Sequence, residues 1–120
     1  MASILVMDDE APIRALLSTA LQSAGYAVVE AANGREGLQL YRQAAADLVI
    51  VDLMMPELNG SDTIIELTRE FLDIKVIAIS GVFGEEYLRK TARLLGARQT
   101  LRKPFRIEEL LSTVRYELAH

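Results

Sequence analysis

Short apolar runs alternate five times with longer segments of helical spacing along this chain. The runs are rich in β-branched residues and predict strands near 3–7, 26–31, 47–52, 75–80 and 98–102. The intervening and final segments predict helices near 11–24, 34–45, 60–71, 84–95 and 106–118. This alternation predicts an α/β fold, in which a parallel sheet is covered by helices on both faces.

Proline, glycine and the apolar stripes support these helix positions. Pro12 suits the first turn of a helix, and Gly25 and Gly96 stand where two helices need a left-handed cap. The expected core stripes are Leu16, Leu17, Ala20 and Leu21 in the first helix, Ile64, Ile65, Leu67 and Phe71 in the third, and Leu110, Leu111, Val114 and Leu118 in the fifth.

Composition narrows the class of protein. With 120 residues, 51% of them hydrophobic, the chain is expected to form one domain over residues 1–120. The absence of cysteine excludes disulfides and zinc-thiolate sites, and a net charge of −4 argues against direct nucleic-acid binding. The start of the chain lacks a basic region, and no apolar run approaches the roughly 18 residues of a membrane span. A cytoplasmic protein without membrane contact is expected.

Polar groups stand at the ends of four of the predicted strands. Asp8 and Asp9 follow the first, Asp52 ends the third, Ser80 ends the fourth and Lys103 follows the fifth. Ligands of open α/β sheets bind at the carboxyl ends of the strands. If the strands are parallel, these five side chains meet in one crevice.

The three aspartates predict a divalent cation. Carboxylates crowded at one edge repel one another, and a cation relieves that repulsion. Oxygen ligands without Cys or His favour Mg²⁺, with Mn²⁺ as a substitute. Because Mg²⁺ keeps several waters and is often bound by carboxylates together with phosphate oxygens, the site is suited to a phosphoryl group.

One of these aspartates is a candidate to accept the phosphoryl group itself, as a carboxylate can do. Asp52 is the single acid on its strand and precedes the loop 53–60, so it is the best candidate. Lys103 supplies a positive charge for the phosphoryl oxygens, and Ser80 supplies a hydroxyl donor.

Taken together, the motifs resemble the receiver domain of bacterial two-component response regulators, including the chemotaxis regulators. The resemblance covers the whole chain and implies a flavodoxin-like, doubly wound sheet of five parallel strands in the order 2-1-3-4-5, with five helices. The motifs that carry it are Asp8-Asp9, Asp52 with Pro56 and Gly60 downstream, Ser80-Gly81 and Lys103-Pro104-Phe105.

The resemblance also implies roles for the acidic residues. Asp52 is the expected phosphoacceptor and a metal ligand. Asp9 is expected to bind Mg²⁺ directly, Asp8 to act mainly through water, and Met54 to contribute its backbone carbonyl.

The remaining motif residues take switch and structural roles by the same resemblance. Ser80, followed by Gly81, is expected to sense the phosphoryl group, and Lys103 to pair with it. The Lys103–Pro104 bond is expected to be cis, far above the roughly 5% base rate for such bonds. Structural roles are expected for Pro56, Gly60 and Pro104.

The chain departs from the usual receiver pattern in two respects. Thr100 stands where receivers carry an aromatic switch residue, so coupling is expected to run mainly through the loop after the fourth strand, with Phe83 or Tyr87 taking part. Met54 and Val82, which flank the phosphoryl site by the resemblance, are both apolar. Without a polar side chain to hold the attacking water, a fairly long-lived aspartyl phosphate is expected.

The implied function is a switch and not an enzyme. A sensor histidine kinase or a histidine phosphotransfer protein would phosphorylate Asp52, and the face of the fourth helix, fifth strand and fifth helix would change its affinity for a downstream protein. The sequence leaves open the kinase, the target, the pathway, homodimerisation, and whether the receiver stands alone or belongs to a longer protein.

Other interpretations remain open at the level of sequence. A Mg²⁺-dependent phosphohydrolase that uses an aspartyl phosphate is one, although Met54 stands where such enzymes commonly carry a second aspartate. A pseudo-receiver that docks partners without phosphate is another. The cluster of Arg89, Lys90 and Arg93 is either a solvated face or a docking site for an acidic partner.

Overall fold

The apolar runs form a single parallel sheet. The computed structural model describes residues 1–54, 60–81 and 85–120, apart from the side chains of residues 85, 87 and 88. Its strands follow the order β2-β1-β3-β4-β5, which confirms the predicted flavodoxin-like topology. They are β1 (Ser3–Met7), β2 (Ala27–Ala31), β3 (Leu48–Asp52), β4 (Val76–Ser80) and β5 (Gln99–Arg102).

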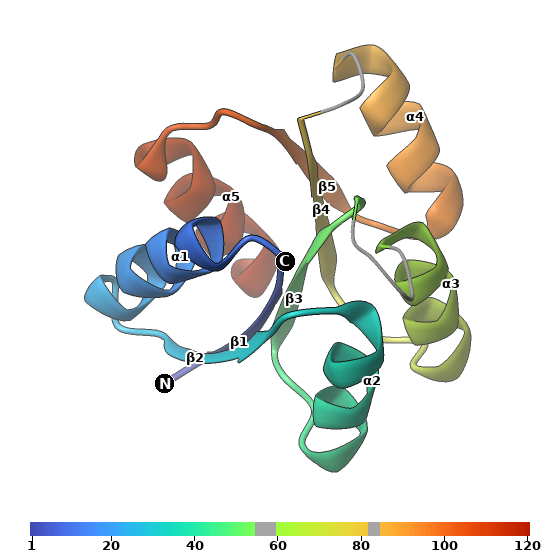
Figure 1. Cartoon of the computed structure of the whole chain (residues 1–120), viewed down its shortest axis with the longest axis horizontal. Coiled ribbons are helices and arrows are strands. Elements are labelled where there is room, and N and C mark those ends of the chain that lie inside the picture. Colours follow the sequence, from blue (N-terminus) through green and yellow to red (C-terminus); the bar gives the residue numbers. More distant parts are fainter. Residues whose placement is uncertain (55–59, 82–84) are drawn as a thin grey trace.

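Helices cover both faces of this sheet, with α1 and α5 on one side and α2, α3 and α4 on the other (Figure 1). All element bounds agree with the predicted ranges to within two residues. Among the described residues, no helix is long and apolar enough to cross a membrane. The helices are α1 (Ala11–Ser23), α2 (Gly34–Gln43), α3 (Gly60–Glu70), α4 (Glu85–Leu95) and α5 (Ile107–Ala119).

Burial on both faces explains why the strands are continuous apolar runs. Successive side chains of a strand point to opposite faces. In β1, Ile4 and Val6 pack with residues of α1 and α5, whereas Leu5 and Met7 pack with residues of α2 and α3. Two hydrophobic layers therefore pack against the sheet, and they fix the positions of the residues at the carboxyl ends of its strands.

The two predicted glycine caps are confirmed, whereas one predicted core position of the first helix is wrong. Gly25 and Gly96 adopt φ angles of 96° and 108°, in the left-handed region that glycine tolerates. Leu17 and Leu21 are fully buried, but Leu16, placed on the same stripe from the sequence, is half exposed. Neighbouring positions lie about 100° apart around a helix, so Leu16 faces away when Leu17 faces the sheet.

Candidate functional site

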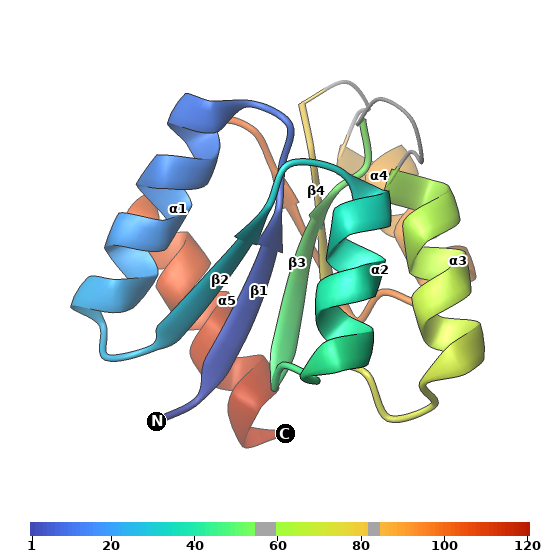
Figure 2. The ribbon, with the colours of Figure 1, turned by 60° about the horizontal axis from the view of Figure 1, so that its bottom comes forward.

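The strand ends that carry polar residues lie along one edge of the sheet, the upper edge in Figure 2. Asp8 directly follows β1, Asp52 and Ser80 are the last residues of β3 and β4, and Lys103 directly follows β5. Asp8, Asp52 and Ser80 are buried. Because β1, β3, β4 and β5 are consecutive neighbours, the parallel topology brings these four positions to the same crevice.

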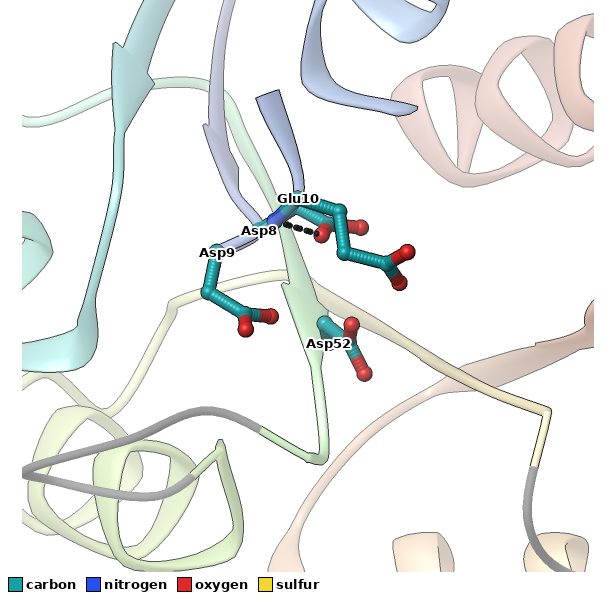
Figure 3. A group of neighbouring side chains, drawn as sticks. All are labelled: Asp8, Asp9, Glu10 and Asp52. Carbon is teal, nitrogen blue, oxygen red and sulfur yellow. Dashed lines mark hydrogen bonds between the residues drawn. The ribbon is translucent and has the colours of Figure 1, made fainter. Parts of the chain in front are cut away.

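Four acidic side chains gather in this crevice. Asp8, Asp9, Glu10 and Asp52 each place one carboxylate oxygen within 4.8 Å of the others, around the end of β1 (Figure 3). Asp9 and Glu10 are exposed, whereas Asp8 and Asp52 are buried. Glu10 was not among the site residues predicted from the sequence. Its signal was its place as the third consecutive acid, directly before the first helix.

Lys103 contacts three of the four acidic side chains. Its Nζ lies 2.9 Å from Asp52 Oδ2, 3.1 Å from Asp8 Oδ2 and 3.2 Å from Glu10 Oε1. Burial alone would lower the pKa of Lys103, but hydrogen bonds and charge attraction from Asp52 and Asp8 outweigh burial and raise it. The lysine therefore stays charged at any physiological pH and offsets part of the negative charge.

The environment of Asp8 disfavours its ionised form. Burial raises the pKa of its carboxyl, and the charge of Asp52 adds to this, against the lowering effects of the Glu10 N–H and of Lys103. A folded-state pKa above the unfolded value means that this group costs stability as the pH rises through that interval. The crevice thus holds more negative charge than Lys103 alone neutralises, and a further cation would relieve the repulsion between its carboxylates.

Two contacts orient the carboxylate of Asp52. Its Oδ1 accepts a hydrogen bond of 3.0 Å from the backbone N–H of Met54, and its Oδ2 accepts the one from Lys103. Met54 is thereby placed at the rim of the site, with its side chain half exposed. A role for the Met54 carbonyl as a metal ligand stays a prediction.

The end of β4 packs closely against Lys103. The Lys103 N–H donates to the Ser80 carbonyl at 2.9 Å, so the two strand ends are joined beside the acidic group. A Cβ on Gly81 would lie 3.2 Å from the Lys103 Cβ, which leaves little room for a side chain there. Thr100 is half-buried on β5 and pairs with Ala78, two positions before the strand end at which Ser80 stands.

The remaining predicted residues bear on the shape of the site. The Lys103–Pro104 bond is cis, as predicted. Gly60 begins α3 directly against the end of β3, where its N–H donates to the Leu53 carbonyl at 3.2 Å. Four positions with predicted roles lie outside the described part of the structure. They are Pro56, Val82, Phe83 and, for its side chain only, Tyr87.

Arg14 is a second residue that the sequence reasoning missed. Its Nη1 donates to the Asp8 carbonyl at 2.6 Å, while its Nε is held by Glu30 Oε1 at 3.2 Å. This contact ties the segment after β1 to helix α1 and to strand β2. Arg14 therefore positions the backbone that carries Asp8 and Asp9.

The donor set fits a hard divalent cation. The clustered ligands are all carboxylate oxygens, the type that Mg²⁺ and Mn²⁺ prefer. Exposed Asp9 gives access from solvent, and buried Asp52 provides a fixed oxygen beside it. The crevice can thus hold a small cation together with an anionic group that Lys103 also contacts.

Comparisons with known proteins agree with this geometry. Residues 4–115 match the family model described as response regulator receiver domain. Over 112 residues, the chain is 41% identical to the probable transcriptional regulator ycf27 of Porphyra purpurea, covering 93% of this chain and 45% of that protein. Over 115 residues, it is 36% identical to the chemotaxis protein CheY of Thermotoga maritima, covering 92% of this chain and 95% of that protein.

A solved structure is similar over nearly the whole length of both chains. It is the response regulator protein TrrA from Thermotoga maritima in complex with Mg²⁺-BeF, with a TM-score of 0.88, 33% identity, and coverage of 98% of this chain and 99% of that one. The chain therefore belongs to the response regulator receiver domain family of two-component signal transduction. It spans less than half the length of the ycf27 relative.

Proposed function

We propose that the chain accepts a phosphoryl group on Asp52 from a histidine kinase or a histidine phosphotransfer protein, and that this switches its binding to a downstream protein. One observation carries the proposal. The buried Asp52 carboxylate lies 2.9 Å from the Lys103 ammonium and beside the oxygens of Asp8 and Asp9. An acceptor oxygen, a cation for the phosphoryl oxygens and a set of metal ligands therefore share one crevice.

In the proposed transfer, an Asp52 oxygen forms a bond to phosphorus while the bond from phosphorus to the donor's histidine nitrogen breaks. Lys103 would pair with an oxygen of the phosphoryl group, since it already reaches the acceptor carboxylate. Asp8, Asp9, Asp52 and the Met54 carbonyl would hold Mg²⁺, which when bound neutralises charge on the phosphoryl oxygens. The Met54 N–H keeps the acceptor carboxylate oriented.

The response to phosphorylation is proposed to begin at β4. Ser80 ends this strand, and its carbonyl accepts a hydrogen bond from the Lys103 N–H. This closeness to Lys103 supports a role for the Ser80 hydroxyl and the following Gly81 in sensing a new anion in the crevice. Because Thr100 replaces the usual aromatic residue, the change would pass mainly through the segment after β4 to the face of α4, β5 and α5. Such a switch shifts an existing equilibrium between two states.

Two apolar residues bear on the lifetime of the phosphorylated form. Met54 is half exposed at the rim of the site, and Val82 lies outside the described residues. The valine side chain has no hydrogen-bonding atom and the methionine sulfur is only a weak acceptor, so neither holds an attacking water as a polar side chain would. A slow loss of the phosphoryl group from Asp52 is therefore part of the proposal.

The test is incubation of the chain with Mg²⁺ and acetyl phosphate, followed by intact-mass analysis. The expected result is the gain of one phosphoryl group per chain, which saturates with time. Continuous multiple-turnover release of phosphate from small esters would instead identify a phosphohydrolase. Failure to gain any phosphoryl group, with Mg²⁺ present and from several phosphodonors, would leave a phosphate-independent docking module.

Mg²⁺ is expected to raise the thermal stability of the chain through this same crevice. A ligand at one hundred times its Kd stabilises the folded state by about 2.7 kcal/mol. Asp9→Asn should remove most of that gain, because Asp9 is the proposed direct ligand in the cluster and an amide lacks the carboxylate's negative charge. The measurement is the melting temperature with increasing MgCl₂.

Asp73→Asn is the matched control, since Asp73 is an exposed acid on the segment between α3 and β4, away from the acidic crevice. It should leave the Mg²⁺ response unchanged. Equal responses of the wild type and Asp9→Asn would remove Asp9 from the proposed ligand set.

A further inference from the structure

Helix α4 presents a row of charged side chains on one face. Glu86, Arg89, Lys90 and Arg93 are all exposed. Glu86 and Lys90 are four residues apart, as are Arg89 and Arg93, and each of these pairs lies three residues from the other, which places the four side chains on the same side of the helix. They line a shallow hollow of about 250 Å³. In Figure 1, α4 lies at the rim of the molecule, and the exposure of the four side chains places this face toward solvent.

A second hollow continues this surface from α4 onto β5. It measures about 60 Å³, several times the roughly 10–15 Å³ that one water requires. It shares Arg89 and Arg93 with the first hollow and adds Arg98, so the two are continuous. Its other lining residues are Ala97, Gln99 and Thr100. The basic residues of the two hollows, Arg89, Lys90, Arg93 and Arg98, together form a surface that we term the basic groove.

The basic groove has an excess of positive charge. Lys90 is paired with Glu86 at 3.5 Å. In the part of the chain that the structure describes, no carboxylate lies within 4.0 Å of the guanidinium groups of Arg89, Arg93 or Arg98. By contrast, Arg42 on α2 is paired with Glu70 at 2.8 Å.

The chain as a whole has a net charge of −4, in contrast to the positive charge of the basic groove. The charge of the groove is therefore opposite in sign to that of the molecule as a whole. A partner that bears negative charge is attracted to this face, whereas the remaining surface repels it.

We propose that the basic groove docks an acidic segment of a downstream partner protein, whose Asp or Glu side chains pair with Arg89, Arg93 and Arg98. This rests on the proposed function, because the groove lies on the face of α4 and β5 that would respond to phosphorylation. Arginine binds carboxylates in a two-pronged geometry, and the hollow beside Thr100 has room for such a group.

The observations favour a protein over a nucleic acid. The groove is short, and the acidic crevice with the overall negative charge would oppose a long polyanion. Nucleic-acid binding depends on many phosphate contacts and on a broadly basic surface. An acidic peptide needs only the few cations that the groove provides.

The experiment is an NMR titration of the isotope-labelled chain with an oligoglutamate peptide, using oligoglutamine as the uncharged comparison. Oligoglutamate is expected to shift the amide signals of α4 and the start of β5, and to bind more weakly as salt is raised. The triple variant Arg89→Gln, Arg93→Gln, Arg98→Gln should bind at least about tenfold more weakly, at roughly two- to fivefold for each lost pair.

Arg35→Gln is the matched control for each single substitution of Arg89, Arg93 or Arg98, because it likewise removes one positive charge from an exposed site, here on α2. It should bind oligoglutamate as the wild type does. Equal binding by the triple variant, or shifts spread over the whole surface, would overturn the proposal. Tighter binding of a DNA oligonucleotide of equal charge in the groove would overturn it in favour of nucleic acid.

Phosphorylation of the same samples separates this proposal from the function on which it rests. The triple variant should still gain one phosphoryl group, because none of its three arginines contacts the acidic crevice. If the wild type is phosphorylated but does not bind oligoglutamate, only the docking proposal fails. If it binds the peptide but gains no phosphoryl group, the proposed function fails, and the groove remains an acidic docking site.

Discussion

Asp52→Asn is expected to reduce phosphoryl incorporation from one group per chain to none. The carboxylate oxygen that faces Lys103 at 2.9 Å is the proposed nucleophile, and an amide in its place has no negative charge with which to attack phosphorus. The substitution keeps the size of the buried side chain, so the fold should be retained. Intact mass after incubation with Mg²⁺ and acetyl phosphate provides the measurement.

The neighbouring acids make the position of the phosphoryl group a necessary part of this experiment. Asp8 and Asp9 lie in the same cluster and could accept the group if Asp52 were not the nucleophile. Peptide mapping of the wild-type product should locate it on Asp52. Asp73→Asn, which removes an exposed acid elsewhere, should be phosphorylated like the wild type. Stoichiometric incorporation by Asp52→Asn would assign the acceptor to another residue.

The fold was accessible from the sequence because its strands are buried on both faces. Alternate residues such as Ile4 and Leu5 enter different hydrophobic layers, so both must be apolar, and the runs stand out from the helical segments. The order of strands in the sheet was not contained in that pattern. It came from the resemblance, because strand order depends on contacts between segments far apart in the chain.

The site was predicted only as far as backbone topology determines it. Asp8, Asp52, Ser80 and Lys103 occupy strand ends, and parallel strands bring their ends together whatever the side chains do. Glu10 reaches Lys103 across 93 positions in sequence. That contact depends on the path of the segment before α1, which sequence periodicity does not specify.

Contacts and burial of other helix residues could not be predicted from the sequence either, because periodicity does not specify them. Arg14 holds the Asp8 carbonyl because α1 starts beside the end of β1 and places its first turn there. Glu117 is buried on α5, where periodicity alone would assign a charged residue to the surface. In each case the rotation of a helix about its axis decides the contact, and a single charged position carries little signal about that rotation.

Gly60→Ala is expected to lower the free energy of unfolding by about 3 kcal/mol, the upper part of the usual range for overpacking. A Cβ at this position would overlap the Asp52 carbonyl oxygen and the Leu53 Cα, and would lie 2.7 Å from the Asp52 carbonyl carbon. These are backbone atoms, so they cannot give way as a flexible side chain would. Chemical denaturation at equilibrium measures the loss.

Gly25→Ala is the control that separates crowding from backbone conformation. Gly25 has a φ of 96° but nothing within 4 Å of an added Cβ, so its substitution should cost only about 1 kcal/mol, from left-handed strain. Because the obstruction at Gly60 falls on Asp52 itself, Gly60→Ala should also slow phosphoryl transfer under conditions in which it stays folded. Gly25→Ala should not, since it lies at the opposite end of α1. Equal losses of stability and equal transfer rates in the two variants would show that the close approach of α3 to the end of β3 does not position the acceptor.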